Sequence, residues 1–298
     1  MKSKSLGPLL ILLAGIFWGS MGLFVRRLQI LGFDAVQITS ARLRLAAVFF
    51  DAILLLRDPK GFRIRLKDLP LFLGLGLGSI LFFTLCYFSA ITQMPLSTAA
   101  ILLYTSPIWV MLMAVLFFHE KLDRTKLLAL ALAFGGCVLV SGIGGGGLSL
   151  TGLLLGLGSG LGYGLYSILG TIALRRYAPL TVTAYTFSVA GLGSCFLCSP
   201  LVILNRLSAY ASESASLSVA LFFVLTALVT AVVPFLLYTL GLRTVEASKA
   251  AILATVEPMV ATLFGVVVFS EPLTLLSALG IALILGAVIL LNRPARDG

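Results

Sequence analysis

Residues 97–107 read STAAILLYTSP and residues 248–258 read SKAAILATVEP, so the chain repeats itself at a shift of 151 residues. The same register extends beyond this stretch and pairs Tyr87 with Tyr238, Leu112 with Leu263, Glu120 with Glu271, Ala131 with Ala282 and Gly135 with Gly286. A shift of 145 residues pairs Gly15 and Gly19 with Gly160 and Gly164. This internal duplication predicts two halves of similar structure.

The composition argues against a soluble domain. Of the 298 residues, 60% are hydrophobic and only 11% are charged, whereas soluble domains carry about a quarter charged residues. One core of this length cannot bury so much apolar surface, and much of it must face lipid. The sequence therefore predicts an all-α polytopic membrane protein.

Polar islands divide the chain into ten apolar runs, each close to the roughly 20 residues that a transmembrane helix needs. We place the spans at 8–28, 35–56, 69–92, 97–118, 125–142, 150–174, 180–204, 217–240, 247–269 and 274–291. The first half then covers 1–143, a glycine-rich outer linker covers 144–149, and the second half covers 150–298. Each half then holds five spans. Because five is an odd number, the second half enters the bilayer inverted relative to the first. Inverted repeats around a central cavity are typical of secondary transporters that work by alternating access.

Basic residues set the expected orientation, because cytoplasmic loops hold the excess of Lys and Arg. With the N-terminus inside, three basic residues lie in outer loops (Arg26, Arg27 and Arg206) and two lie within the second span (Arg42 and Arg44). The other sixteen lie inside: Lys2, Lys4, Arg57, Lys60, Arg63, Arg65, Lys67, Lys121, Arg124, Lys126, Arg175, Arg176, Arg243, Lys249, Arg293 and Arg296. We expect both termini in the cytoplasm and a protein of the bacterial inner membrane. The basic residues are too scattered for a nucleic-acid site.

Several motifs recur in a fixed order: Trp18-Gly19-Ser20, Arg42 followed by Ala46, the run from Ala99 through Pro107 to Glu120, and its copy from Ala250 through Glu257-Pro258 to Glu271-Pro272. With Gly135 and Gly286 in the last span of each half, the chain resembles the drug/metabolite transporter superfamily, specifically ten-helix transporters with two EamA domains. The resemblance implies export or uptake of small organic metabolites, often amino acids, commonly driven by proton exchange. Arg44 departs from the family pattern, which more often has an apolar residue there.

Ionisable groups inside a span are functional candidates because they are costly in lipid. Glu257 lies near the middle of the ninth span, directly before Pro258, which kinks the helix as Pro107 does in the fourth. At this depth a carboxyl group suits a proton carrier or a cation site; the alternative is a packing residue. Arg42 suits a substrate carboxylate, and its alternative is a structural clamp.

Aromatic residues form the second group of candidates, because they offer an apolar face and a polar group to a small zwitterionic or cationic solute. We expect six to line the pathway: Trp18, Tyr87, Tyr104, Tyr163, Tyr166 and Tyr238. Three charged residues near span ends are possible gates: Glu120, Glu271 and Lys249. Helix capping and loop pairing are the alternative role for Glu120.

A catalytic or metal cluster is absent from the sequence pattern, because the only histidine lies at a span end and no Asp pair lies within a span. We therefore expect no enzyme activity and no cofactor beyond a proton gradient. The expected partners are a small-molecule substrate and membrane lipids, and ten spans suffice for a monomer. An uptake permease of the same fold and a passive channel or lipid-handling protein remain the alternatives.

Overall fold

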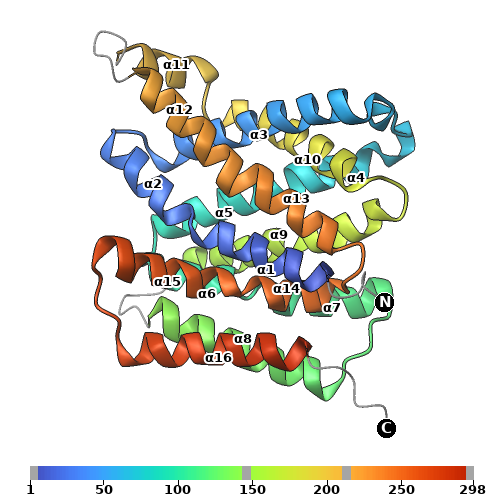
Figure 1. The fold of residues 1–298 in the computed structure, drawn as a ribbon, viewed down its shortest axis with the longest axis vertical. Helices are drawn as coiled ribbons and strands as arrows, with labels where there is room; N and C mark the ends of the chain where they lie inside the picture. Colours follow the sequence, from blue (N-terminus) through green and yellow to red (C-terminus); the bar gives the residue numbers. More distant parts are fainter. Residues whose placement is uncertain (1–5, 143–148, 210–215, 293–298) are drawn as a thin grey trace.

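The computed structural model describes residues 6–142, 149–209 and 216–292, and all regular elements in these ranges are helical. Figure 1 shows them as a bundle whose long helices run roughly along one direction. The predicted linker over 144–149 lies outside the described residues except for Ser149. The α-helices are α1 (Leu6–Gly19), α2 (Met21–Ile30), α3 (Ala35–Arg57), α4 (Leu69–Leu73), α5 (Phe82–Ile91), α6 (Leu96–Leu103), α7 (Ser106–Phe118), α8 (Arg124–Ser141), α9 (Leu150–Leu174), α10 (Pro179–Gly193), α11 (Pro200–Ala209), α12 (Ser216–Ala227), α13 (Val233–Gly241), α14 (Ala247–Ala254), α15 (Val256–Phe269) and α16 (Leu275–Asn292).

Eight helical stretches in the described residues are long and apolar enough to cross a membrane, and a ninth joins them if the pair Pro179–Phe196 and Pro200–Ser208, bent by 78°, is one span. Helix α3 has 23 residues, which is long enough, but it carries Arg42, Arg44 and Asp51. The prediction of a multi-span helical protein is confirmed. The count of ten spans stays a prediction.

The two halves break their helices at matching places. The fourth predicted span divides into α6 and α7 around Tyr104 and Thr105, and the ninth divides into α14 and α15 at Thr255. Pro107 and Pro258 follow directly, within the first turn of α7 and of α15, where a missing N–H costs the helix little. Each half also contains a π-helical segment, Gly74–Leu81 and Leu228–Val232, and these two segments overlap when the chain is shifted by 151 residues.

Helix ends repeat in the same register. His119 and Ser270 have left-handed backbones, with φ of 55° and 54°. The next residues, Glu120 and Glu271, donate their N–H groups to the carbonyls of Ala114 at 3.3 Å and Gly265 at 3.1 Å. Each of these bonds spans seven residues and satisfies a carbonyl group in the last turns of the helix. The duplication is thus present in backbone geometry as well as in sequence.

Glycines allow close helix crossings at matched points. A Cβ on Gly15 would lie 3.2 Å from the Ala254 carbonyl, and one on Gly160 would lie 3.2 Å from the Leu103 carbonyl. Each crossing holds α1 or α9 against the break of the opposite half. Gly135 and Gly286 face open space.

Helices α8 and α16 lie side by side and run in opposite directions, as expected for the closing helices of inverted halves (Figure 1). Their close approach uses Gly136 and Gly280, because a Cβ on either would lie 2.7 Å from the other's carbonyl oxygen.

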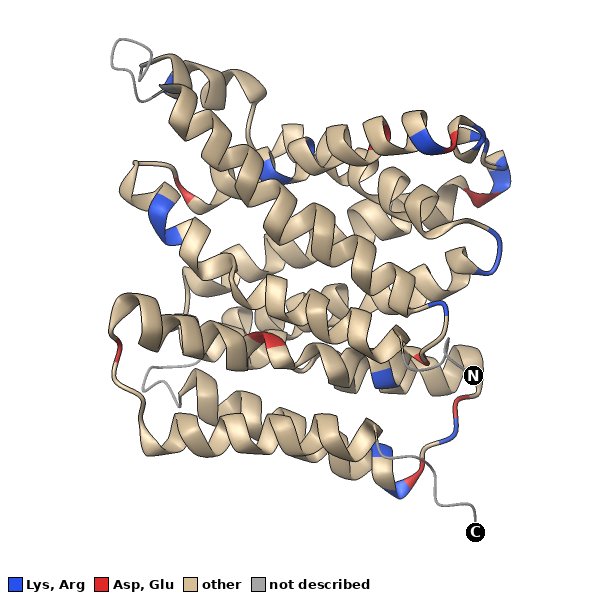
Figure 2. Ribbon diagram, in the orientation of Figure 1, with Lys and Arg blue, Asp and Glu red and all other residues tan. Residues whose placement is uncertain are grey.

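We call the end of the bundle where α1 begins and α16 ends the terminal end, and the opposite end the far end. Figure 2 shows that most Lys and Arg residues of the described chain lie at the terminal end. The far end holds the basic residues of α2 and α11, which are Arg26, Arg27 and Arg206. This asymmetry agrees with the expected loop charges, although Lys2, Lys4, Arg293 and Arg296 lie outside the described residues.

Candidate functional site

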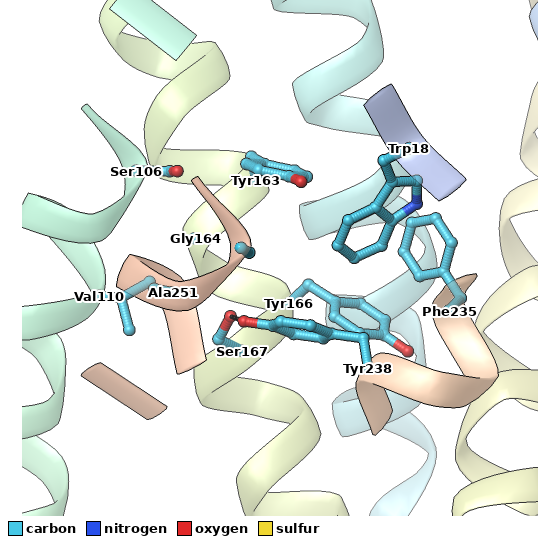
Figure 3. A pocket seen from close by; sticks show the side chains of 11 residues that line it. Trp18, Ser106, Val110, Tyr163, Gly164, Tyr166, Ser167, Phe235, Tyr238 and Ala251 are labelled. Atoms are coloured by element: carbon cyan, nitrogen blue, oxygen red, sulfur yellow. Dashed lines mark hydrogen bonds between the residues drawn. The ribbon is translucent and has the colours of Figure 1, made fainter. Parts of the chain in front are cut away.

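An aromatic cluster occupies the middle of the bundle, where α1, α9 and α13 meet (Figure 3). Trp18, at the end of α1, is 7% exposed. Its ring centroid lies 6.1 Å from that of Tyr163, 5.0 Å from Phe235 and 5.3 Å from Tyr238. At the 145-residue shift Trp18 and Tyr163 are equivalent positions, so the two halves contribute matching aromatic residues to one centre.

The cluster surrounds a cavity of about 20 Å³, which is roughly the room that one water molecule needs. Four of the six predicted aromatic residues line it: Trp18, Tyr163, Tyr166 and Tyr238. The other lining residues are Ser106, Val110, Gly164, Ser167, Phe235, Ala251 and Ala254. This volume is far below the several hundred Å³ of a usual ligand pocket.

Two hydroxyl pairs join α9 to α13 beside this cavity. The hydroxyls of Tyr166 and Thr239 are 2.7 Å apart, and those of Ser167 and Tyr238 are also 2.7 Å apart. All four side chains are buried, and buried hydroxyls need such partners. The pairs therefore fix α13 to α9 on the terminal side of Trp18 and Tyr163.

Glu257 adjoins the cluster through Tyr163, whose hydroxyl donates to Oε2 of Glu257 at 2.9 Å. The carboxyl group lies in the first turn of α15, where the free N–H groups of a helix favour negative charge. Among the described residues, no Lys, Arg or His nitrogen lies within 4.0 Å of its oxygens. Glu257 is therefore a membrane-embedded acid without a direct cationic partner.

Arg42 on α3 brings a positive charge to the same region. Its guanidinium lies within electrostatic reach of Glu257 and Tyr163, and Nη1 contacts the sulfur of Met21 at 2.6 Å. Its Nε is buried and has no hydrogen-bond acceptor among the described residues. A buried charged donor left without an acceptor is costly, so this nitrogen is suited to receive a polar group of a solute.

Arg44 has a different role, which explains its departure from the family pattern. Its Nε donates to Oγ of Ser194 and its Nη2 to the carbonyl of Ser194, both at 3.2 Å, and Nη2 also donates to the carbonyl of Cys198. These carbonyls lie at the bend between α10 and α11. Arg44 thus clamps this bend, and the role of Arg42 stays a prediction.

The two remaining aromatic candidates lie near Glu257 but do not line the cavity. Tyr104 follows α6 at the helix break and packs on the cluster formed by Cys137, Val256, Met259, Val260 and Ile284. Tyr87 on α5 packs on the cluster of Ala90, Met94 and Ala99. Both tyrosines are within electrostatic reach of Glu257.

The three possible gate residues lie away from the pocket. Glu120 follows α7 at the terminal end and contacts the start of α14. Glu271 follows α15 at the far end, and its Oε1 lies 2.6 Å from Nη1 of Arg26. Lys249 is half-buried on α14 and interacts electrostatically with Glu246 and Lys126.

From the sequence we missed Phe235 of the aromatic cluster and two members of the hydroxyl pairs, Ser167 and Thr239. Their repeat equivalents are Thr84, Gly22 and Phe88, so the duplication gave no signal for them. Helical spacing could have found Ser167, because Tyr163, Tyr166 and Ser167 share one face at i, i+3 and i+4. The partners on α13 depend on tertiary packing and had no such signal.

The fold and this central cluster define a helical membrane protein with several spans. The chain belongs to the EamA-like transporter family, whose model matches residues 5–142 and 150–293. An uncharacterized transporter of Archaeoglobus fulgidus is 30% identical over 292 residues, which cover 95% of each chain. An uncharacterized transporter of Bacillus subtilis is 29% identical over 283 residues, covering 92% of this chain and 89% of the relative. Family and relatives point to a transporter rather than an enzyme.

A crystal structure also has this fold. It superposes with a TM-score of 0.79 and covers 97% of each chain, at 18% sequence identity. At that identity the likeness concerns the fold alone. The family model and the relatives confirm the resemblance to EamA transporters, and the crystal structure confirms the helical fold.

Proposed function

We propose that this protein is a secondary active transporter that moves an amino-acid-like zwitterion or a related cation across the bacterial cytoplasmic membrane by alternating access. The observation that carries the proposal is that Arg42 and Glu257 lie within electrostatic reach of each other without forming an ion pair among the described residues. Two opposite charges held apart in a low-dielectric site match the two charges of a zwitterion.

Each end of such a solute has a suitable partner. The guanidinium of Arg42 can bind a carboxylate through two parallel hydrogen bonds. The carboxylate of Glu257 can accept hydrogen bonds from an ammonium group. Trp18 and Tyr163, whose rings meet beside Glu257, offer cation–π contact to the same group.

Proton exchange follows from the same carboxyl group. When Glu257 binds a proton it no longer attracts an ammonium group, so proton and solute compete for one site and cross in opposite directions. The charged or titratable groups near it are Arg42 on α3, Tyr87 on α5, Tyr104 after α6, Cys137 on α8 and Tyr163 on α9. Export driven by proton exchange is the proposed direction, and uptake is the alternative outcome of the test.

The small cavity supports a carrier more than an open channel. Ligand sites usually occupy several hundred Å³, and this centre offers about 20 Å³, so a continuous pore is absent from the described pocket. The proposed motion exchanges two inverted five-span halves, 1–143 and 150–298, around the central site. We further propose cytoplasmic termini, from the basic terminal end, and a monomer in the lipid bilayer.

The test uses purified protein in liposomes, after a thermal-shift screen of amino acids selects a probe. We expect saturable uptake of the labelled probe, stimulation by unlabelled probe inside, and acceleration by a pH gradient. Glu257→Gln should abolish the response to the gradient. The matched control is Asp51→Asn, because Asp51 accepts hydrogen bonds from Ser188 at 2.8 and 2.9 Å and does not line the cavity.

Two outcomes would contradict the proposal. Flux that rises linearly with concentration and shows no counterflow identifies a channel. Full gradient-driven transport by Glu257→Gln removes Glu257 from the coupling.

A further inference from the structure

Glu120 fastens one half of the molecule to the other at the terminal end. Its carboxylate accepts hydrogen bonds from the N–H of Ala247 at 3.1 Å and from Oγ of Ser248, at the start of α14. Nζ of Lys126 lies 3.5 Å from Glu120 and 2.5 Å from Glu246. The side chains of Glu120 and Lys126 are only 9% and 10% exposed, so this contact is a buried latch between α7 and α14.

The 151-residue register predicts where the matching latch should form at the far end. Glu271 is the equivalent of Glu120, and Leu96 and Ser97 are the equivalents of Ala247 and Ser248. The residue before Glu271 has a left-handed backbone, as the residue before Glu120 does. Both glutamates also make the same closing backbone hydrogen bond. The far end thus contains the hydrogen-bonding groups of the terminal latch: a carboxylate, a serine hydroxyl and the N–H of a helix start.

The far-end groups do not meet in this structure. No hydrogen bond joins Glu271 to Leu96 or Ser97 in the described chain; Glu271 pairs with Arg26 instead, and these two side chains are 46% and 49% exposed. Leu96 is 62% exposed, whereas Ala247 is 1% exposed.

Helix packing differs in the same way. Helix α14 packs on α7 and α9, whereas α6 has no comparable contact with their repeat equivalents, α15 and α2, among the described helices. A Cβ on Gly22, the equivalent of Ser167 of the terminal hydroxyl pairs, would meet no atom within 4 Å. The groups of the latch are therefore in contact at the terminal end, and their equivalents are apart at the far end.

We infer that Glu120 and Glu271 are alternating latches: when the far end closes, Glu271 binds Leu96 and Ser97 at the start of α6, and Glu120 releases the start of α14. The inference rests on the proposed alternating access. Its support is that one molecule shows both arrangements of the same repeated element, one engaged and one released. Arg26 is the counter-ion of the released carboxylate, as Lys126 is of the engaged one.

The two latches are unequal by sequence. Lys126 corresponds to Ser277 in the second half, so the far latch lacks the buried cation that the terminal latch has. A buried carboxylate that is hydrogen-bonded and also paired with a cation is held more firmly than one with hydrogen bonds alone. The state with a closed terminal end should therefore dominate at rest, as this structure shows it.

Disulfide cross-linking tests the far latch directly. The double variant Ser97→Cys/Glu271→Cys is prepared in protein whose four native cysteines are replaced by alanine and whose folding is checked. We expect a mild oxidant to form the disulfide and to stop exchange, with recovery on reduction. The control pair is Thr92→Cys/Glu271→Cys, because Thr92 is exposed at the end of α5 and its equivalent, Arg243, does not contact Glu120.

Maleimide labelling of single cysteines gives a second readout that needs no substrate. With Glu120 and Glu271 both present, maleimide should label Leu96→Cys readily and Ala247→Cys slowly. Adding Glu120→Gln should raise labelling at position 247 and lower it at 96 by roughly tenfold or more, because hydrogen bonds to a charged group are lost. Adding Glu271→Gln should leave position 96 fully labelled.

The outcomes separate this inference from the proposed function. Equal cross-linking of the Ser97 and Thr92 pairs, or labelling at 96 and 247 that rises together in Glu120→Gln, overturns the latches. If the cross-link and the reciprocal labelling appear but no amino acid is exchanged, the latches stand and the proposed substrate falls.

Discussion

The terminal and far ends of the bundle carry the same repeated elements but hold them differently. At the terminal end Glu120 is buried against α14, and hydroxyl pairs join α9 to α13. At the far end Glu271 is half-exposed beside Arg26, and the start of α6 is uncovered. The two ends therefore share their local backbone structure and differ in tertiary contacts, and the inferred latches explain this difference as one engaged and one released state.

The largest expected effect compares the ion pairs of the two ends. Lys126→Met removes the cation from a carboxylate that is 9% exposed, and breaking a buried pair costs about 3 kcal/mol. Arg26→Met removes an exposed partner, and such pairs contribute less than about 1 kcal/mol. Thermal unfolding in detergent should show a large loss for the first variant and almost none for the second.

A double variant sharpens this result. Lys126→Met/Glu120→Gln should recover part of the lost stability, because no uncompensated buried charge remains. Equal losses for Lys126→Met and Arg26→Met would show that the two ends are not held differently.

The next effect concerns the close crossing of α1 and α15 at Gly19. A Cβ on Gly19 would lie 2.6 Å from the carbonyl oxygen of Glu257, whereas one on Gly22 meets nothing within 4 Å. Gly19→Val should destabilise the protein by about 2 kcal/mol through overpacking and should reduce transport. The matched control is Gly22→Val, three residues later on α2, where the added side chain meets open space. This variant should fold normally. A normal melting curve for Gly19→Val would refute the close crossing.

The smallest effect compares the repeat-related tyrosines. Tyr238→Phe deletes the hydroxyl paired with Ser167 and leaves that serine buried, which should cost about 1 kcal/mol. In the described residues the hydroxyl of Tyr87, at the far end, has no hydrogen-bond partner. Tyr87→Phe should therefore leave the melting temperature of the protein unchanged. Equal shifts for the two variants would mean that the hydroxyl pairs do not hold the terminal end.

Much of the architecture followed from apolar length and the repeat, because burial in lipid leaves few choices for the backbone. Glu257 beside a helix break and the central position of Trp18 also followed, since intramembrane charge and repeat position locate them. From the sequence we chose Arg42 over Arg44 as the substrate residue but did not predict the clamp that Arg44 makes. Helical period separates their faces, but only the bend at Ser194 shows which face carries the clamp.

The inequality of the two ends was beyond sequence reasoning. Glu120 and Glu271 occupy equivalent positions with the same local backbone, and each could engage or release its helix start. Lys126 was overlooked because its equivalent is Ser277, so the repeat did not mark it. Which latch is engaged is a property of the conformational state, and two states of one chain share one sequence.

The most direct test of alternating access measures both ends in one protein. Spin-label distances would be recorded for Gln93/Val267 across the far end and for the repeat-matched pair Thr244/Leu116 across the terminal end, all of them exposed positions. As pH and a probe amino acid are varied, we predict that every population with a shorter far-end distance has a longer terminal distance. Distances that lengthen together, or that never change, would contradict the account.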